Sequence, residues 1–263
     1  MKLNVLRADP AGNITLFVLD DVAKELRAPI SAKLMEIPEF KAEQVGFYCA
    51  PTVEGADGHM EMMGGEFCGN ATRAFGMLIA QEKGGAEHVA IEASGCDHLV
   101  TVDVDLAAGT SRAEMPTPRA VSQVTVEGVT GTLVDLAGIA HLVVEGVEPS
   151  EEFFAKAEPI FQGIEGMDAY GVMFLDPVTG KMTPLVKVIA PNTLIWEGSC
   201  GSGSLAAAVC KSQGAPDGEF AQDFIQPAGI VRATVVRKDG AITAAFIGGP
   251  VTLDAPVDVE VTL

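Results

Sequence analysis

Two cysteines that lie almost half the chain apart have neighbours suited to acid–base chemistry. Cys68 lies in FCGNATRAFGMLIA and Cys200 lies in SCGSGSLAAAVCKS. A glycine and an alanine-rich, helix-favouring stretch follow each of them. A cysteine at a helix start meets unpaired backbone N–H groups and the positive end of the helix dipole, which favour the thiolate and lower the thiol pKa. The same N–H groups can bind a carboxylate.

The presence of two such cysteines favours one kind of reaction. If both helix starts bind one carboxylate, the α-carbon next to it lies between two sulfurs. One thiolate can then remove the α-proton while the opposite thiol protonates the other face, which inverts the carbon without pyridoxal phosphate or a metal. A single cysteine of this kind is more often inert core packing, and two facing thiols could also form a redox disulfide. The repeated Cys-Gly pair favours catalysis.

Other segments repeat in the same order as the cysteines. The stretch AGNITLFVLDDV (Ala11–Val22) resembles AGIAHLVVEGV (Ala137–Val147), and each half closes on a proline, at Pro116 and Pro250. Similar segments in a fixed order indicate internal duplication. The sequence therefore predicts two copies of one α+β domain, residues 1–120 and 121–263, joined near residues 118–130.

Hydrophobic period and turn residues predict one helix in each half, surrounded by mostly antiparallel strands. The first helix should run from Gly69 to about Ala80, before the stop signal Lys83-Gly84-Gly85, and the second from Gly201 to about Ser212. The expected strands are Lys2–Arg7, Ile14–Leu19, Gln44–Ala50, Val89–Glu92, Leu99–Val104, Arg112–Met115, Thr132–Asp135, His141–Glu145, Ala169–Leu175, Leu185–Ile189, Val231–Arg237, Ile242–Ile247 and Val257–Thr262.

Composition narrows the partners that we expect. The chain has 263 residues with 17 Lys+Arg against 36 Asp+Glu, and a formal net charge of −19 argues against nucleic acid or an anionic membrane as a partner. No apolar run is long enough to span a bilayer, and the first residues lack a signal-peptide core. The chain is expected to be cytoplasmic and to act on a small molecule.

The cysteine count is five, and no C-x-x-C pair occurs. An odd, low count does not fit a disulfide scaffold or a zinc ribbon. The nearest approach to a metal cluster is His88, Cys96 and His98, for which an ordinary strand edge is the better explanation. We expect no metal.

The two cysteine segments, GGEFCGNATRAFG and GSCGSGSLAAAV, resemble the paired motifs of the diaminopimelate epimerase family of cofactor-independent racemases. The segments ADPAGNITLFVLD, AEQVGFY and IGGPVTLDAPVDVEV are also similar to segments of that family, so the resemblance covers essentially the whole chain. It implies two pseudo-symmetric α/β domains, each a curved, mostly antiparallel sheet around a central helix. It further implies an active site in the cleft between them, no cofactor, and a possible homodimer.

The resemblance also implies roles for individual residues. Cys68 and Cys200 match the catalytic pair. His141 matches a family histidine that supports the second half-site, although an ordinary strand histidine explains it equally well. The remaining positions match contacts to the substrate: Asn13, Gln44, Gly69, Asn70, Gly201 and Ser202, of which the last four hold the α-carboxylate.

Departures from the family pattern concern the far end of the substrate. Gly55, Ile139 and Gly171 replace asparagines of the epimerase, and APNTLIWEGSC replaces its Glu-Arg-Gly segment. A buried polar group that hydrogen-bonds its ligand can discriminate between substrates by several orders of magnitude, so the loss of several such groups should change the substrate. The α-carbon chemistry is retained in this interpretation, whereas the distal specificity is replaced.

The run NTLIWE-x-SCGSG is most similar to the histidine racemase branch of the superfamily, so we expect an amino-acid racemase with histidine as the best single substrate. The alternatives are a diaminopimelate epimerase with an altered distal pocket and a non-catalytic amino-acid binding protein. Three acids are candidate substrate contacts or ordinary surface charges: Glu43, Glu66 and Glu197. Tyr48 and Trp196 could line a pocket or belong to the core.

Overall fold

The chain forms two compact units, and the computed structural model describes residues 1–190 and 192–263. Unit 1 comprises Met1–Glu114 and Gly248–Leu263, and unit 2 comprises Met115–Ile247. Pro191, in the segment expected to replace the epimerase's Glu-Arg-Gly, lies outside the described residues. The chain therefore leaves unit 1 once and returns to it for its last 16 residues, Gly248–Leu263.

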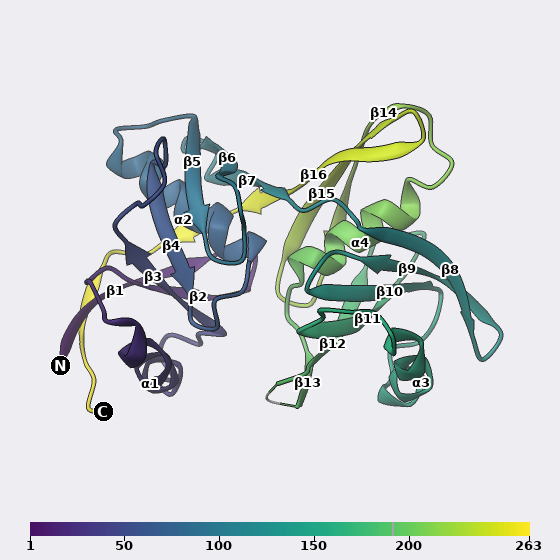
Figure 1. Cartoon of the computed structure of the whole chain (residues 1–263), viewed down its shortest axis with the longest axis horizontal. Coiled ribbons are helices and arrows are strands. Elements are labelled where there is room, and N and C mark those ends of the chain that lie inside the picture. The colour runs from purple at the N-terminus through teal and green to yellow at the C-terminus, as the bar shows by residue number, and fades with distance from the viewer. Residues whose placement is uncertain (191) are drawn as a thin grey trace. The chain divides into compact units, whose positions relative to one another are not determined.

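Unit 1 contains a sheet in which a helix connects each pair of parallel strands along the chain (Figure 1). Its strand order is β7-β6-β5-β4-β3-β2-β1-β17, and β18 also pairs with β1. The elements are β1 (Lys2–Asp9), β2 (Thr15–Val18), α1 (Lys24–Met35), β3 (Gln44–Cys49), β4 (Gly58–Met62), α2 (Gly69–Glu82), β5 (His88–Ala93), β6 (Val100–Asp105), β7 (Thr110–Met115), β17 (Thr252–Leu253) and β18 (Val257–Glu260). The pairs β2–β3 and β4–β5 are parallel because α1 and α2 return the chain to the same end of the sheet.

The two helices of unit 1 pack against opposite faces of this sheet. Strand residues alternate between the faces, so that Phe17 packs with Phe75 of α2, whereas its neighbours on β2 pack with Ile30 and Leu34 of α1. The residues of α2 are themselves buried from Gly69 to Ala80. The helix that follows Cys68 is thus held rigidly in the larger core.

Unit 2 has the same kinds of element in a similar order. The elements are β8 (Ala120–Val126), β9 (Val129–Asp135), β10 (Ile139–Glu145), α3 (Glu151–Ala157), the 3-10 helix η1 (Glu158–Phe161), β11 (Ala169–Leu175), β12 (Met182–Val188), β13 (Thr193–Trp196), α4 (Gly201–Lys211), β14 (Gly218–Ile225), β15 (Ile230–Lys238) and β16 (Ala241–Pro250), whose last residues belong to unit 1. Six strands form a sheet in the order β13-β12-β11-β10-β9-β8, and β14, β15 and β16 are neighbours in that order. Only β10–β11 is a parallel pair within the six-stranded sheet.

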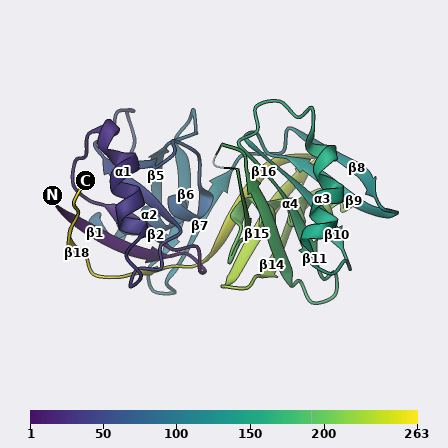
Figure 2. The same cartoon turned by 90° about the horizontal axis from the view of Figure 1, so that it is seen from below.

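In unit 2, as in unit 1, helices cover both faces of the sheet. α4 contacts β10 and β15, whereas Phe153 and Phe154 of α3 and Phe161 of η1 pack in a separate core with Leu142 and Phe174. Figure 2 shows α1 and α3 each lying over strands of its own unit. The helix after Cys200 is therefore placed, like the helix after Cys68, on one face of a sheet.

The mixed α+β fold, made mostly of strands, agrees with the expectation from sequence, and both helices after the cysteines are confirmed. The prediction of a single helix per half is wrong, because α1 and α3 are also present. α1 contains Pro29 and has no side-chain cap, so it lacks the usual sequence signals of a helix. The expected link at residues 118–130 is also wrong, because β8 occupies most of it.

The C-terminal segment lies in unit 1, whereas the expected second domain, 121–263, contained it. Val257 and Val259 of β18 pair with Val5 and Leu3 of β1. The backbone hydrogen bonds of the first strand are completed by the last one, which explains why the C-terminal residues belong with unit 1.

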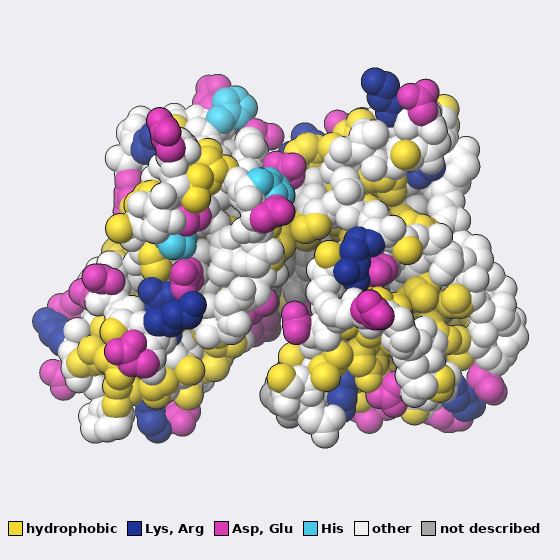
Figure 3. Space-filling model, in the orientation of Figure 1, with side chains coloured by type: hydrophobic (Ala, Val, Ile, Leu, Met, Phe, Trp, Pro, Cys, Tyr) yellow, Lys and Arg dark blue, Asp and Glu magenta, His cyan; other side chains and the backbone are white. Residues whose placement is uncertain are grey.

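Of the helices in the described part of the chain, none combines the length and apolar character that a membrane crossing requires. On the face shown in Figure 3, Lys and Arg side chains lie singly or in small groups among Asp and Glu side chains. The absence of nucleic acid and membrane partners stays a prediction.

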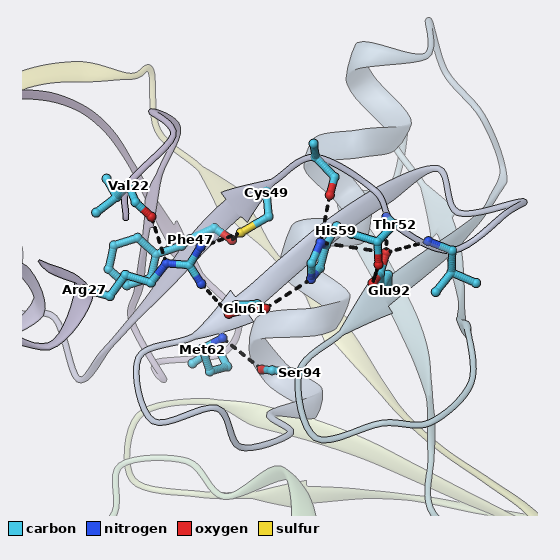
Figure 4. Close-up of polar contacts among 12 residues, drawn as sticks. Val22, Arg27, Phe47, Cys49, Thr52, His59, Glu61, Met62, Glu92 and Ser94 are labelled. Atoms are coloured by element: carbon cyan, nitrogen blue, oxygen red, sulfur yellow. Dashed lines mark hydrogen bonds and ion pairs between the residues drawn. The ribbon is translucent and has the colours of Figure 1, made fainter. Parts of the chain in front are cut away.

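A polar cluster ties α1 to the sheet of unit 1 (Figure 4). Arg27 of α1 forms an ion pair with Glu61 of β4, donates to the Val22 carbonyl at 3.1 Å and to Cys49 Sγ at 3.3 Å, and lies over the Phe47 ring. The Arg27 side chain is 14% exposed, so the pair is shielded from water. Sequence patterns gave no sign of this cluster.

We expect Arg27→Met to lower the free energy of unfolding by about 1–3 kcal/mol, because it leaves the Glu61 carboxylate without its charged partner. The midpoint of urea unfolding measures the effect. The exposed ion pair Arg232–Asp223 provides the control, since Arg232→Met should cost less than about 1 kcal/mol. Equal midpoints for the two variants would contradict the assigned role of Arg27.

Candidate active site

Cys68 and Cys200 occupy the same local structure in their separate units. Each is the N-cap residue of its helix, with φ and ψ of −125° and 108° at Cys68 and −120° and 111° at Cys200. Cys68 Sγ accepts a hydrogen bond from the Ala71 N–H at 3.5 Å, and Cys200 Sγ accepts one from the Gly203 N–H at 3.3 Å. Each sulfur therefore lies against the first turn of a helix, as the sequence predicted.

Hydroxyl groups fix both helix starts in a matching way. Thr72 donates to the Cys68 carbonyl at 2.8 Å, and Ser204 donates to the Cys200 carbonyl at 2.7 Å. Both hydroxyl side chains are fully buried. The backbone that carries each sulfur is held by interactions that do not use the sulfur.

Burial decides the protonation of both thiols. It raises the pKa of Cys68, although the N–H groups of Ala71 and Asn70 and the Gln44 side chain act in the opposite direction. Burial raises the pKa of Cys200 further, well above its ordinary value. The expectation that the helix starts lower the thiol pKa is therefore wrong in its net sign, because desolvation of the thiolate outweighs the hydrogen bonds.

Three of the predicted substrate contacts in unit 1 form one hydrogen-bonded group beside Cys68. The Asn13 side-chain oxygen accepts from Gln44 Nε2 at 3.0 Å and from Asn70 Nδ2 at 3.3 Å. Gln44 also donates to Thr15 Oγ1 at 2.8 Å. Gly69 and Asn70 are the first residues of α2, where N–H groups have no partner within the helix. A substrate carboxylate could bind there.

Glu43 extends this group with an acid. The Asn13 amide donates to its Oε2 at 2.6 Å. Burial raises the pKa of Glu43, and the nearby Asp9 charge acts in the same direction. This carboxylate is well placed to receive a positively charged or protonated group next to Asn13.

In unit 2 the predicted residues also come together. Ser202 Oγ lies 2.8 Å from His141 Nε2 and 3.5 Å from Cys200 Sγ, so it links the histidine to the thiol. Ser202 was expected to hold a carboxylate through its backbone. The structure shows in addition that its hydroxyl contacts both neighbours, and that Gly201 opens α4 beside it.

His141 is fully buried in β10, which fixes its charge state. Burial lowers its pKa to about 3, so the ring is neutral near pH 7. Nδ1 has no hydrogen-bond partner within the described residues. Position 171 lies opposite His141 in the sheet, and a Cβ there would come within 3.1 Å of Nδ1. The glycine at this position makes room for the ring.

Glu197 and Gln226 complete the surroundings of Cys200. The Cys200 thiol hydrogen-bonds the Glu197 carboxylate, whose charge adds to burial in raising the thiol pKa. Gln226 accepts from the Cys200 N–H at 2.7 Å and donates to Ser204 Oγ at 2.9 Å. The sequence suggested Glu197 as a substrate contact. It gave no signal for Gln226, which lies beyond α4 and is buried by tertiary packing.

The other residues suggested by the sequence lie outside the hydrogen-bonded groups beside Cys68 and Cys200. Tyr48 donates to Glu82 at the far end of α2 and packs edge-on against Phe75, and Trp196 is 42% exposed. Glu66 is exposed, and its charge acts to raise the Cys68 pKa. His88 and His98 face Asp103 and Asp97 at the surface. All five cysteines are free thiols.

Comparison with known proteins assigns the family. The model of the N-terminal domain of the histidine racemase CntK matches residues 2–257. The chain belongs to the histidine racemase family. It is 29% identical to a histidine racemase of Fusobacterium nucleatum, covering 98% of this chain and 94% of the relative. A histidine racemase of Staphylococcus aureus is 27% identical, with 93% and 92% coverage.

The fold is also similar to that of a solved structure. A predicted epimerase from Pseudomonas aeruginosa has a TM-score of 0.69 and 13% identity, covering 99% of this chain and 100% of that one. This likeness shows the fold, and the family match makes the protein an isomerase of the racemase and epimerase class.

We expect Glu197→Gln to lower the pKa of Cys200, because the substitution removes a negative charge that favours the thiol. Thiolate absorbance at 240 nm, followed against pH, measures the change. The signal of Cys200 is obtained by subtracting the absorbance of the double variant, Glu197→Gln with Cys200→Ser, from that of the single variant Glu197→Gln. A pKa equal to or above that of the wild type would contradict the contact.

We expect His141→Gln to reduce the loss of stability in acid. The His141 pKa is about 3 when folded and about 6.5 when unfolded, so below pH 6.5 only the unfolded chain takes up this proton. The wild type should lose about 2 kcal/mol from this residue between pH 7 and pH 5. Urea unfolding at the two pH values measures it, and an equal loss in both proteins would contradict the buried, neutral state.

Proposed function

We propose that this protein is a histidine racemase that inverts the α-carbon with Cys68 and Cys200 as acid and base, without a cofactor. The observation that carries the proposal is the matched pair of cysteine N-caps, each with its sulfur on the first turn of a helix. Two sulfurs with matching backbone geometry fit a reaction that needs one acid–base group on each face of the α-carbon.

The finer architecture is part of the proposal. Unit 1 runs through two strands, a helix, two strands, a cysteine-led helix and further strands, and unit 2 follows the same order with three strands before each helix and a 3-10 helix after the first. This order supports two pseudo-symmetric domains that originate from one duplicated ancestor. In the proposed enzyme the two half-sites act together on one substrate.

Binding begins with the α-carboxylate in this mechanism. The N–H groups of Gly69 and Asn70, and of Gly201 and Ser202, lie at the positive ends of α2 and α4, where they stabilise an anion. The same groups stabilise the negative charge that develops on the carboxylate oxygens when the α-proton leaves. Glu43 offers a negative partner for the substrate amine or imidazole.

Proton transfer then uses the two sulfurs on opposite faces of the substrate α-carbon. The Cys68 thiolate removes the α-proton, and the C–H electron pair is delocalised into the carboxylate. The Cys200 thiol donates its proton to the other face, which leaves a Cys200 thiolate. The reverse direction exchanges the roles. The contact with Glu197 favours the thiol form of Cys200, which suits it to start as the acid.

The choice of histidine rests on relatives that carry that name, at 27–29% identity. An alternative substrate within the same chemistry is diaminopimelate. We expect wild-type enzyme in D₂O to exchange the α-proton of L-histidine and to produce D-histidine without added cofactor, as followed by ¹H NMR and chiral chromatography. Exchange with LL-diaminopimelate but not with histidine would show that histidine is the wrong substrate assignment. Binding of histidine without exchange would indicate a non-catalytic binding protein.

Single substitutions test the assignment of the sulfurs. We expect Cys68→Ser and Cys200→Ser each to reduce racemisation by about 10³-fold or more, because a serine hydroxyl is a far weaker acid than a thiol. The control is Cys210→Ser, whose thiol lies at the other end of α4 and should leave the rate unchanged. Full activity of either catalytic variant would refute the two-base mechanism.

A further inference from the structure

One charged side chain has no role in the mechanism above, although it lies inside the same helix as Cys68. Arg73 of α2 is 0% exposed, and it is the one Lys, Arg, Asp or Glu side chain that is fully buried in the described part of the chain. Burying a guanidinium is costly unless an anion compensates it. The sequence motif CGNATR placed this arginine near the cysteine but gave no reason for it.

The hydrogen bonds of Arg73 are all to neutral oxygens. Nε donates to Asn70 Oδ1 at 3.1 Å, and Nη1 donates to the carbonyls of Gly249 and Pro250 at 3.1 and 3.0 Å. Nη2 is buried and has no partner among the described residues. These contacts hold the guanidinium in place, but none of them neutralises its charge.

The charges near Arg73 point to Cys68 as its counterpart. The Arg73 pKa is lowered by burial to about 10, and the Cys68 thiolate is the strongest of the charges that oppose this effect, ahead of Asp9. Asp9 is already engaged, because it accepts from the Gly12 N–H at 2.7 Å and pairs with Arg7. Cys68 is the N-cap of the same helix, two residues before Asn70, to which Arg73 donates at 3.1 Å, so an anion formed at the cysteine lies beside the group that the guanidinium contacts.

A hydrogen-bonded path also joins Arg73 to the groups that would hold the substrate. Asn70 accepts from Arg73 and donates to Asn13, which accepts from Gln44. Because its amide oxygen is fixed by the guanidinium, the Asn70 amide nitrogen is directed to Asn13. Arg73 thus orients the group beside Cys68 as well as carrying charge.

We propose that the buried guanidinium of Arg73 is the counter-charge of the Cys68 thiolate and a positioning residue for the Cys68 half-site. This extends the proposed function, in which Cys68 acts as acid and base. The other charges that face this site are acids that oppose the thiolate, Glu66 directly and Glu43 through Asn13. Arg73 is the fully buried positive charge on the same helix.

Titration of Cys68 tests the proposal without any turnover. Iodoacetamide alkylation of the full-length protein is followed against pH, and the Cys68 peptide is quantified by mass spectrometry, which separates it from the other four cysteines. Arg73→Met, which removes the charge at similar length, should raise the alkylation midpoint of Cys68 by one pH unit or more. Arg73→Lys, which keeps a charge, should raise it by less than half a unit.

A matched control separates charge from local loosening. Thr72→Ala removes the hydrogen bond to the Cys68 carbonyl in the same buried turn but leaves the guanidinium, so the midpoint should move by less than 0.3 unit. An unchanged midpoint in a folded Arg73→Met protein, with wild-type far-UV circular dichroism, would overturn the proposal and leave Arg73 as a structural strut. If Arg73→Met does not fold, Arg73→Lys decides, since a shift of one unit or more would also overturn it.

The result is independent of the enzymatic assignment. If wild-type protein exchanges no α-proton but the Cys68 midpoint depends on Arg73 as stated, the racemase proposal fails and the counter-charge stands. If exchange occurs and the midpoint is insensitive to Arg73, the counter-charge fails and the racemase proposal stands.

Discussion

The cost of forming a thiolate away from water determines the protonation of the two candidate sulfurs. Both candidate sulfurs are placed at helix starts, where backbone N–H groups favour the anion, and both are buried enough that the thiol still prevails. The opposed effects set the pKa of each thiol, and the proposed two-base reaction needs each sulfur to serve both as base and as acid. Rigid packing of α2 and α4 in their cores maintains that balance, because a small shift of either helix would alter it.

The two sulfurs differ in what surrounds them. Cys68 is next to amides, Gln44 and Asn70, with Arg73 in the interior behind them. Cys200 is next to a carboxylate, Glu197, and to a hydroxyl that is bonded to a neutral histidine. Similar backbones therefore carry different electrostatic settings, and the resting proton is held more firmly on Cys200. Divergence of the side chains around a shared backbone distinguishes the two half-sites.

Local sequence predicted the parts of the site that depend on local structure. The Cys-Gly motifs predicted two helices to within about two residues, since a helix start and its cap are set by neighbours in the chain. Asn13, Gln44 and Asn70 were predicted through a family resemblance, and they are joined by hydrogen bonds. Their role with substrate stays a prediction.

What the sequence missed depends on contacts between distant segments. Gln226 meets Cys200 through tertiary packing, and Arg27 of α1 pairs with Glu61 across the sheet. The sign of the thiol pKa shift was also missed, because desolvation is a property of the assembled core and not of a helix start. α1 was missed for a local reason, since Pro29 and the lack of a cap hide the usual helix signals.

The pairing of β18 with β1 has a consequence for synthesis of the chain. Strand β1 is made before unit 2, and its partner β18 along one edge is made after it. Unit 2 is continuous from Met115 to Ile247, so all its residues are available before β18 is made. Unit 1 must wait with an open strand edge until β18 emerges, which makes it the later unit to complete and the one exposed longer to wrong pairing.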